Sequence, residues 1–151
     1  MTVHAAAPAP NVREAVPFLR VTDMARALRF YVDGLGFVVK QRWAPAGEIR
    51  WCLLTLGGAS LMLQSLVDDD GRDLRPPTPL GLGVRVCFMC ADALRIHDEA
   101  VARGLTPREP FVGNGLWVTT FEDPDGYVLD FESPTDVAED TTLSAWRAGQ
   151  P

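Results

Sequence analysis

The segment DPDGYVLDF, residues 123 to 131, contains the clearest candidate for chemistry in this sequence. It predicts a tight turn followed by a short strand, in which Asp130 stands between apolar neighbours. A carboxylate is costly to bury without a partner. Asp130 must therefore hold a metal, abstract a proton or pair with another side chain. Glu122 precedes the turn, and Glu132 shares the face of Asp130 by strand alternation.

Few other groups support metal or nucleophile chemistry. The two histidines are His4, near the start, and His97, which we expect on the solvated surface of a helix because charged residues flank it. No serine or threonine stands near a histidine in a nucleophile pattern, and no glycine-rich loop has a phosphate-binding pattern. General-base chemistry stays open to Asp130 or Glu132, if burial raises a pKa.

Composition limits the class of protein. The chain has 151 residues, 47% of them hydrophobic, and a formal net charge of −6. The acidic balance argues against nucleic acid or anionic lipid as a partner.

No stretch reaches the roughly 20 apolar residues of a membrane helix, and the start lacks the pattern of a signal peptide. Three cysteines fit a reducing cytoplasm, and we expect the pair Cys87 and Cys90 to be buried structural thiols.

An internal repeat organises the chain. Each copy predicts a strand, a helix capped by an aspartate (Asp23 or Asp92), and three further strands. ALR at 27–29 recurs at 93–95, GASLMLQS matches GYVLDFES, and Trp51 matches Trp117. The predicted organisation is a flexible tail at 1–13, a first module at 14–66, a linker at 67–81, a second module at 82–134, and a C-terminal tail with a short helix at 135–151.

The fold class expected from this order is α+β, with two tandem β-α-β-β-β modules that form curled mixed sheets around a cavity. One helix covers only one face of such a sheet, so the other face is buried elsewhere or lines a pocket. Leu143 and Trp146 share one face of the C-terminal helix, and we expect them to cover a partner or the mouth of the cavity.

With FLRVTDMARALRFYVDGLGF opening the first module and EDPDGYVLDFES closing the second, the sequence resembles the vicinal oxygen chelate superfamily. This superfamily includes glyoxalase I, extradiol dioxygenases and bleomycin-resistance proteins. The resemblance implies a homodimer. It also places the metal ligands of the metal-dependent members at Val16, Met62, Arg85 and Asp130. Only Asp130 among these suits a divalent ion, so we expect no metal and no other cofactor.

Without a metal, Asp130 needs another counter-charge, and Arg85 is the candidate because the resemblance places both at the same end of one concave face. The two side chains either only neutralise each other, or Arg85 also receives an anionic or carbonyl-bearing ligand that Asp130 orients. Aromatic walls hold flat ligands. The predicted ligand-binding residues are Arg85, Asp130, Trp43, Trp51, Trp117, Met62 and Gln64.

These features favour a metal-independent binding protein, nearest the bleomycin-resistance branch of the superfamily. It would sequester an amphipathic or aromatic small molecule, an antibiotic among the candidates, near a dimer interface in the cytoplasm. The alternative is a lyase or isomerase similar to glyoxalase I, with Asp130 and Glu132 as its candidate catalytic residues. A third possibility is a regulatory or partner-binding domain whose own side chains fill the cavity.

Overall fold

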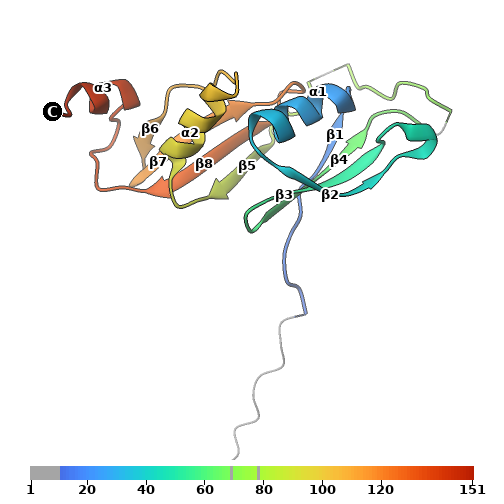
Figure 1. The fold of residues 1–151 in the computed structure, drawn as a ribbon, viewed down its shortest axis with the longest axis horizontal. Coiled ribbons are helices and arrows are strands. Elements are labelled where there is room, and N and C mark those ends of the chain that lie inside the picture. Colours follow the sequence, from blue (N-terminus) through green and yellow to red (C-terminus); the bar gives the residue numbers. More distant parts are fainter. Residues whose placement is uncertain (1–10, 69, 78) are drawn as a thin grey trace, which may run out of the picture.

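The computed structural model describes residues 11–68, 70–77 and 79–151, so His4 and the first part of the predicted tail lie outside the described residues. In that part of the chain, two four-stranded mixed sheets are accompanied by three α-helices (Figure 1). This confirms the α+β class and the two β-α-β-β-β modules. None of the described helices is long and apolar enough to span a membrane.

The first module has the sheet order β1-β4-β3-β2, with β1 parallel to β4. Asp23 begins the helix, since its side chain accepts a hydrogen bond from the Arg26 backbone N–H at 2.9 Å. The helix then continues as a π-helical segment, η1. The elements are β1 (Phe18–Val21), α1 (Met24–Leu28), η1 (Arg29–Gly34), β2 (Val38–Trp43), the 3-10 turn η2 (Pro45–Gly47), β3 (Trp51–Leu56) and β4 (Ala59–Ser65).

The second module repeats this topology in the order β5-β8-β7-β6. Phe18 on β1 pairs with Met62 on β4, and Cys87 on β5 pairs with Asp130 on β8. Met62 and Asp130 are therefore equivalent positions of the repeat. The elements are β5 (Arg85–Met89), α2 (Ala93–Ala102), β6 (Phe111–Gly113), β7 (Leu116–Glu122), β8 (Val128–Pro134) and, after the sheet, α3 (Leu143–Ala148).

A shared aromatic core joins the modules. The rings of Phe37 and Phe88 meet edge to face at 5.9 Å between centroids, and Phe88 stacks on Phe131 at 4.8 Å. Tyr31 and Phe37 belong to one buried cluster with residues of both sheets, among them Leu63 and Leu129. Because the two modules share this core, α1 and α2 lie on the same side of the layer formed by the two sheets (Figure 1).

The DPDG turn also connects the modules. Asp123 is buried and accepts hydrogen bonds from the Tyr31 hydroxyl at 2.8 Å and from the Tyr127 backbone N–H at 2.9 Å. Asp125 accepts from the Thr22 hydroxyl at 2.6 Å. Burial raises the pKa of Asp123, while the hydrogen bonds from Tyr31 and Tyr127 act in the opposite direction.

The segment between the modules returns to the same turn. Gly81 donates its backbone N–H to the Asp125 carbonyl at 3.2 Å and lies against the backbone of Gly126. A Cβ at residue 81 would stand 2.0 Å from the Gly126 carbonyl carbon. Only glycine permits this close approach.

The C-terminal helix, α3, packs against its own module. Leu143 lies in a small buried cluster with Ala93, Val112 and Trp117, and Trp146 meets Trp117 edge to face at 5.7 Å. The two side chains therefore bury an apolar surface beside α2 and do not cover a cavity mouth, while the expected contact with a partner stays a prediction.

Gly81→Ala should destabilise the fold by about 1–3 kcal/mol or more, because the new methyl group collides with backbone that has little room to move. Chemical denaturation monitored by circular dichroism measures the change. The matched control is Gly58→Ala in the β3–β4 hairpin, where an added Cβ meets nothing within 4 Å and little change is expected. Equal effects at both positions would contradict the close contact.

Tyr31→Phe should lower the unfolding free energy by about 1–3 kcal/mol at neutral pH, because it leaves a buried carboxylate oxygen without its donor. The folded-state pKa of Asp123 lies above its unfolded value, so its charge costs stability at neutral pH, and protonation removes that cost as the pH falls. The difference between wild type and Tyr31→Phe should therefore narrow on acidification. The loss in Tyr127→Phe, whose hydroxyl donates to the neutral Arg20 carbonyl at 3.0 Å, should not change over the same range.

Candidate functional site

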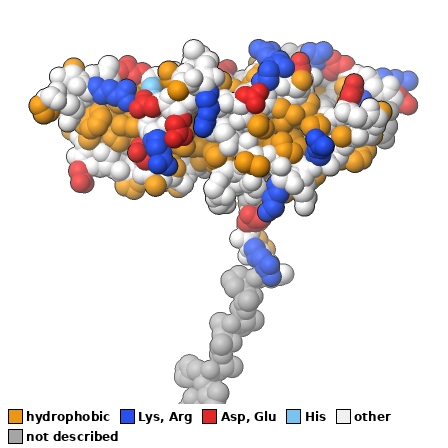
Figure 2. Space-filling view, viewed as in Figure 1, with side chains coloured by type: hydrophobic (Ala, Val, Ile, Leu, Met, Phe, Trp, Pro, Cys, Tyr) orange, Lys and Arg blue, Asp and Glu red, His pale blue; other side chains and the backbone are white. Residues whose placement is uncertain are grey.

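Each sheet has one face that α1 and α2 do not cover, and the two faces point to the same side of the chain (Figure 1). Hydrophobic side chains also remain exposed over both modules (Figure 2). We call the two surfaces the first and second open faces. The first includes Phe18, Arg20, Trp43, Trp51, Met62 and Gln64, and the second includes Arg85, Cys87, Met89, Thr120, Asp130 and Glu132.

Asp130 lies at the centre of the second open face and is 2% exposed. The Thr120 hydroxyl donates to its Oδ1 at 2.6 Å, and the Arg85 guanidinium donates to its Oδ2. This hydrogen bond is the largest cause of the raised pKa of Arg85, whose side chain is 53% exposed. The structure therefore brings the predicted pair together, and both oxygens of the buried carboxylate accept from protein donors.

The positions that the resemblance assigns to metal ligands do not fit a divalent ion. Val16 has no donor atom and Met62 offers only a soft thioether. The third position places the positive charge of Arg85 on the Asp130 carboxylate, where a cation would have to bind.

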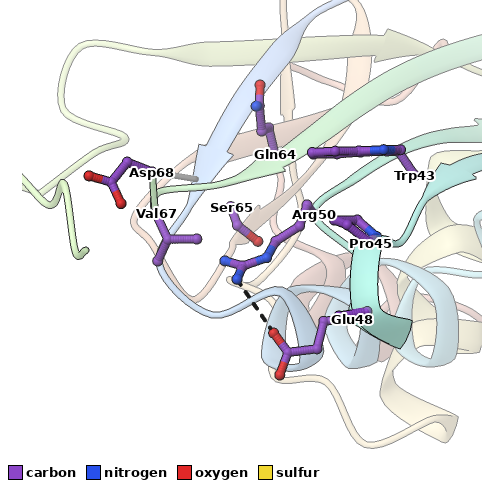
Figure 3. Close-up of a pocket in the computed structure, with 9 residues that line it drawn as sticks. Trp43, Pro45, Glu48, Arg50, Gln64, Ser65, Val67 and Asp68 are labelled. Carbon is purple, nitrogen blue, oxygen red and sulfur yellow. Dashed lines mark ion pairs between the residues drawn. The ribbon is translucent and has the colours of Figure 1, made fainter. Parts of the chain in front are cut away.

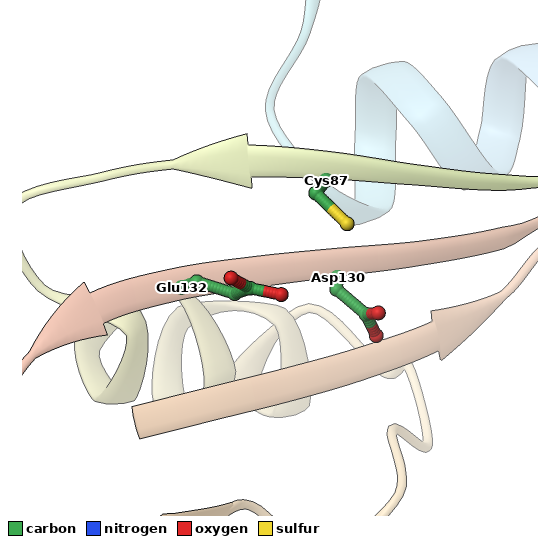
Figure 4. Close-up of side chains that lie close together, drawn as sticks. All are labelled: Cys87, Asp130 and Glu132. Carbon is green, nitrogen blue, oxygen red and sulfur yellow. The ribbon is translucent and has the colours of Figure 1, made fainter. Parts of the chain in front are cut away.

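Another group of donors surrounds Asp130 (Figure 4). One ligand atom each from Cys87, Asp130 and Glu132 lies within 4.8 Å of the others. The expectation that Cys87 is buried is wrong, because it points to the open face, whereas Cys90 is partly buried. Burial and the charges of Glu132 and Asp130 raise the pKa of the Cys87 thiol. A protonated thiol and a carboxylate held by Arg85 make a poor ligand set for a divalent ion.

On the first open face, one row of side chains crosses the whole sheet. Trp43 on β2 pairs with Trp51 on β3, Trp51 with Gln64 on β4, and Gln64 with Arg20 on β1. Trp43 is 52% exposed, and Phe18, beside Met62 in the next row, is 47% exposed. The predicted residues Trp43, Trp51, Met62 and Gln64 thus share one surface.

A pocket of about 340 Å³ lies at the end of this row (Figure 3). Trp43 and Gln64 line it from the open face, and Ser65 and Arg50 line it from the sheet end. Arg50 forms an ion pair with Glu48 at 3.6 Å. The pocket therefore combines an indole surface with polar groups, as sites for amphipathic ligands do.

Trp117 does not belong to either open face. It is 5% exposed and packs beneath α2 and α3. The sequence match of Trp117 to Trp51 is one residue out of register. Leu53 pairs with Met62, and Thr120 pairs with Asp130, which is the repeat equivalent of Met62. Leu53 and Thr120 are therefore equivalent positions. The true equivalent of Trp51 is Val118, and a shift of one residue turns a strand side chain to the other face.

Sequence reasoning missed Phe18, Arg20 and Thr120 as residues of the open faces. The alternation in PFLRV gives a signal for the first two, since Leu19 and Val21 face the core and Phe18 and Arg20 lie between them. Thr120 could have been found by pairing its strand with Asp130. His97 lies on α2, with Nδ1 2.9 Å from Asp98 Oδ1, and takes no part in either face.

Solved structures confirm the architecture. TioX from Micromonospora sp. ML1 superposes with a TM-score of 0.63 at 23% identity, covering 82% of this chain and 99% of TioX. TnmS3, an antibiotic binding protein from Streptomyces sp. CB03234, gives 0.59 at 23% identity over 82% and 98%. A bleomycin-binding protein complexed with bleomycin gives 0.61 at 22% identity over 81% and 98%. No curated protein matches this sequence significantly.

The paired modules with open sheet faces define the class of fold to which the glyoxalases and the bleomycin-resistance proteins belong. Residues 4–131 match the Glyoxalase/Bleomycin resistance protein/Dioxygenase superfamily. The chain belongs to this superfamily, which confirms the resemblance seen in the sequence.

Protein purified without an affinity tag should contain well below one divalent ion per chain after dialysis, because Arg85 competes for the Asp130 carboxylate. Inductively coupled plasma mass spectrometry checks this. About one ion per chain, lost in Asp130→Asn and kept in the exposed control Asp136→Asn, would contradict the poor fit of the donor set.

Proposed function

We propose that this chain is a metal-independent binding protein that sequesters an amphipathic or aromatic small molecule. The observation that carries the proposal is the pair Trp43 and Trp51, which lie side by side on a face that no described helix covers. Exposed aromatic surface of this kind is typical of a ligand or partner site. The neighbouring Gln64 and the pocket beside it supply polar groups that orient a ligand.

A homodimer is part of this proposal. The two open faces of one chain point the same way, so neither closes the other. A two-fold pair of chains could place the first open face of each against the second open face of its partner. The charges suit this pairing, because Arg20 lies on the first face and Glu132 lies on the second, where Asp130 is already balanced by Arg85. The cavity would then lie between two subunits.

Binding is favoured over catalysis by the state of Asp130. A general base needs a carboxylate oxygen that can reach the substrate proton. Both oxygens of Asp130 already accept hydrogen bonds, from Thr120 and Arg85. Asp130 is also only 2% exposed, so a lyase or isomerase would have to uncover it before a substrate could reach it.

The comparisons supply the ligand class only by analogy. One similar structure is described as an antibiotic binding protein and another as a complex with bleomycin. At 22–23% identity these structures share the fold, and an antibiotic ligand for this chain, with resistance by sequestration, is our inference. The exposed thiol of Cys87 suits a reducing compartment, so we also place the protein in the cytoplasm.

N-phenyl-1-naphthylamine, a neutral fluorescent aromatic, tests the binding surface. Trp43→Ala should weaken its binding by about three- to tenfold, since an aromatic contact contributes about 0.5–1.5 kcal/mol beyond buried area. Val101→Ala, which shortens an exposed apolar residue on α2, is the matched control and should not change the affinity. Equal affinities for all three proteins would remove the first open face as the site.

Two further measurements on the same proteins separate the parts of the proposal. Sedimentation equilibrium should report a dimer. If the protein is a monomer and still binds the probe, only the proposal of a cavity between two subunits is contradicted. Arg85→Ala should weaken binding if the Arg85–Asp130 pair contacts the ligand. Unchanged affinity in a folded variant would leave the pair a structural role.

A further inference from the structure

Arg20 differs from the other arginine on the open faces. Its guanidinium Nη2 donates to the Ser65 carbonyl at 3.3 Å. Its Nε is buried and has no hydrogen-bond partner, the one such side-chain atom among the described residues. No described carboxylate lies within 4.0 Å of Arg20, whereas Arg85 contacts Asp130 directly.

A buried donor without an acceptor is costly in the folded protein. A guanidinium also presents several donors in one plane, a geometry that matches carboxylate, sulfonate or phosphate oxygens. The positive charge of Arg85 is already balanced by Asp130, which accepts a hydrogen bond from its guanidinium. The charge available for an incoming anion is therefore that of Arg20, in the half of the repeat that lacks an acid at the position of Asp130.

The place of Arg20 relates this charge to the aromatic surface. It ends the row that starts at Trp43 and runs through Trp51 and Gln64. Three strand spacings separate the first and last Cα atoms of the row, roughly 14 Å. Both end side chains are long, so a molecule of two or three fused or linked rings spans the distance between them.

We propose that Arg20 makes the first open face selective for aromatic ligands that carry an anionic oxygen group. The rings lie on Trp43 and Trp51, and the anion accepts hydrogen bonds from the Arg20 guanidinium. This inference rests on the proposed function and names the class of ligand for the same surface. It also places anion recognition in the first module rather than at Arg85, which was one of two alternatives from the sequence.

Two probes with the same ring system test the inference. 8-Anilinonaphthalene-1-sulfonate is N-phenyl-1-naphthylamine with an added sulfonate. Arg20→Met should weaken binding of the sulfonate by about tenfold or more, because it removes a charged hydrogen-bond donor, and should leave the neutral probe unchanged. Arg20→Lys should restore part of the sulfonate affinity. Fluorescence titrations of each protein with both probes, at one fixed salt concentration, give these affinities.

Arg29→Met is the matched control, because it removes one positive charge from an exposed position on the helical side of the first module. It should affect neither probe. Loss of both probes in Arg20→Met, or unchanged sulfonate binding in that variant, overturns the anion inference while the Trp43 result still supports the binding surface. If wild type binds neither probe, the proposed function fails and this inference fails with it. Thermal denaturation confirms that the variants fold, which we expect because Arg20→Met removes an unsatisfied buried group.

Discussion

Each sheet is covered by a helix on one face only, and the rest of this structure follows from this constraint. A four-stranded sheet has two faces, and each module supplies one helix inside the βαβ unit to cover one of them. The aromatic contacts from Phe37 through Phe88 to Phe131 merge the two helical sides into one core. Both uncovered faces are then held on the same side of the molecule (Figure 1).

The two halves of the repeat use equivalent positions for different purposes. At the position of Asp130 the first module carries Met62, and the acid in the second module is satisfied within its own sheet by Arg85 and Thr120. On the second open face the charge of Asp130 is thus balanced within the sheet. The first open face combines the exposed indole of Trp43 and its neighbour Trp51 with Arg20, which has no carboxylate within 4.0 Å among the described residues. One fold thus carries different chemistry at equivalent positions of its two modules.

Much of this arrangement could be predicted from the sequence. The order of the elements follows from periodicity and from the capping aspartates Asp23 and Asp92, and the family resemblance placed Asp130 near Arg85. Trp117 could not be placed, because alternation tells which residues share a face but a mismatch of one residue reverses the answer. The contact between Tyr31 and Asp123 joins residues 92 positions apart, and no local pattern marks such a pair.

The two walls of the proposed cavity impose an order on any ligand inside it. In the dimer, the surface with Arg20 would face the partner's second open face. There Arg85 balances the charge of Asp130, and Glu132 remains, so one wall of the cavity attracts anions and the other attracts cations or hydrogen-bond donors. A flat ligand between the two walls matches their charges best when its two ends carry different polar groups. Such charge complementarity fixes the orientation of the ligand more than it adds affinity. The aromatic row would supply the area of contact, and the unequal charges of the two repeats would decide which way round the ligand binds.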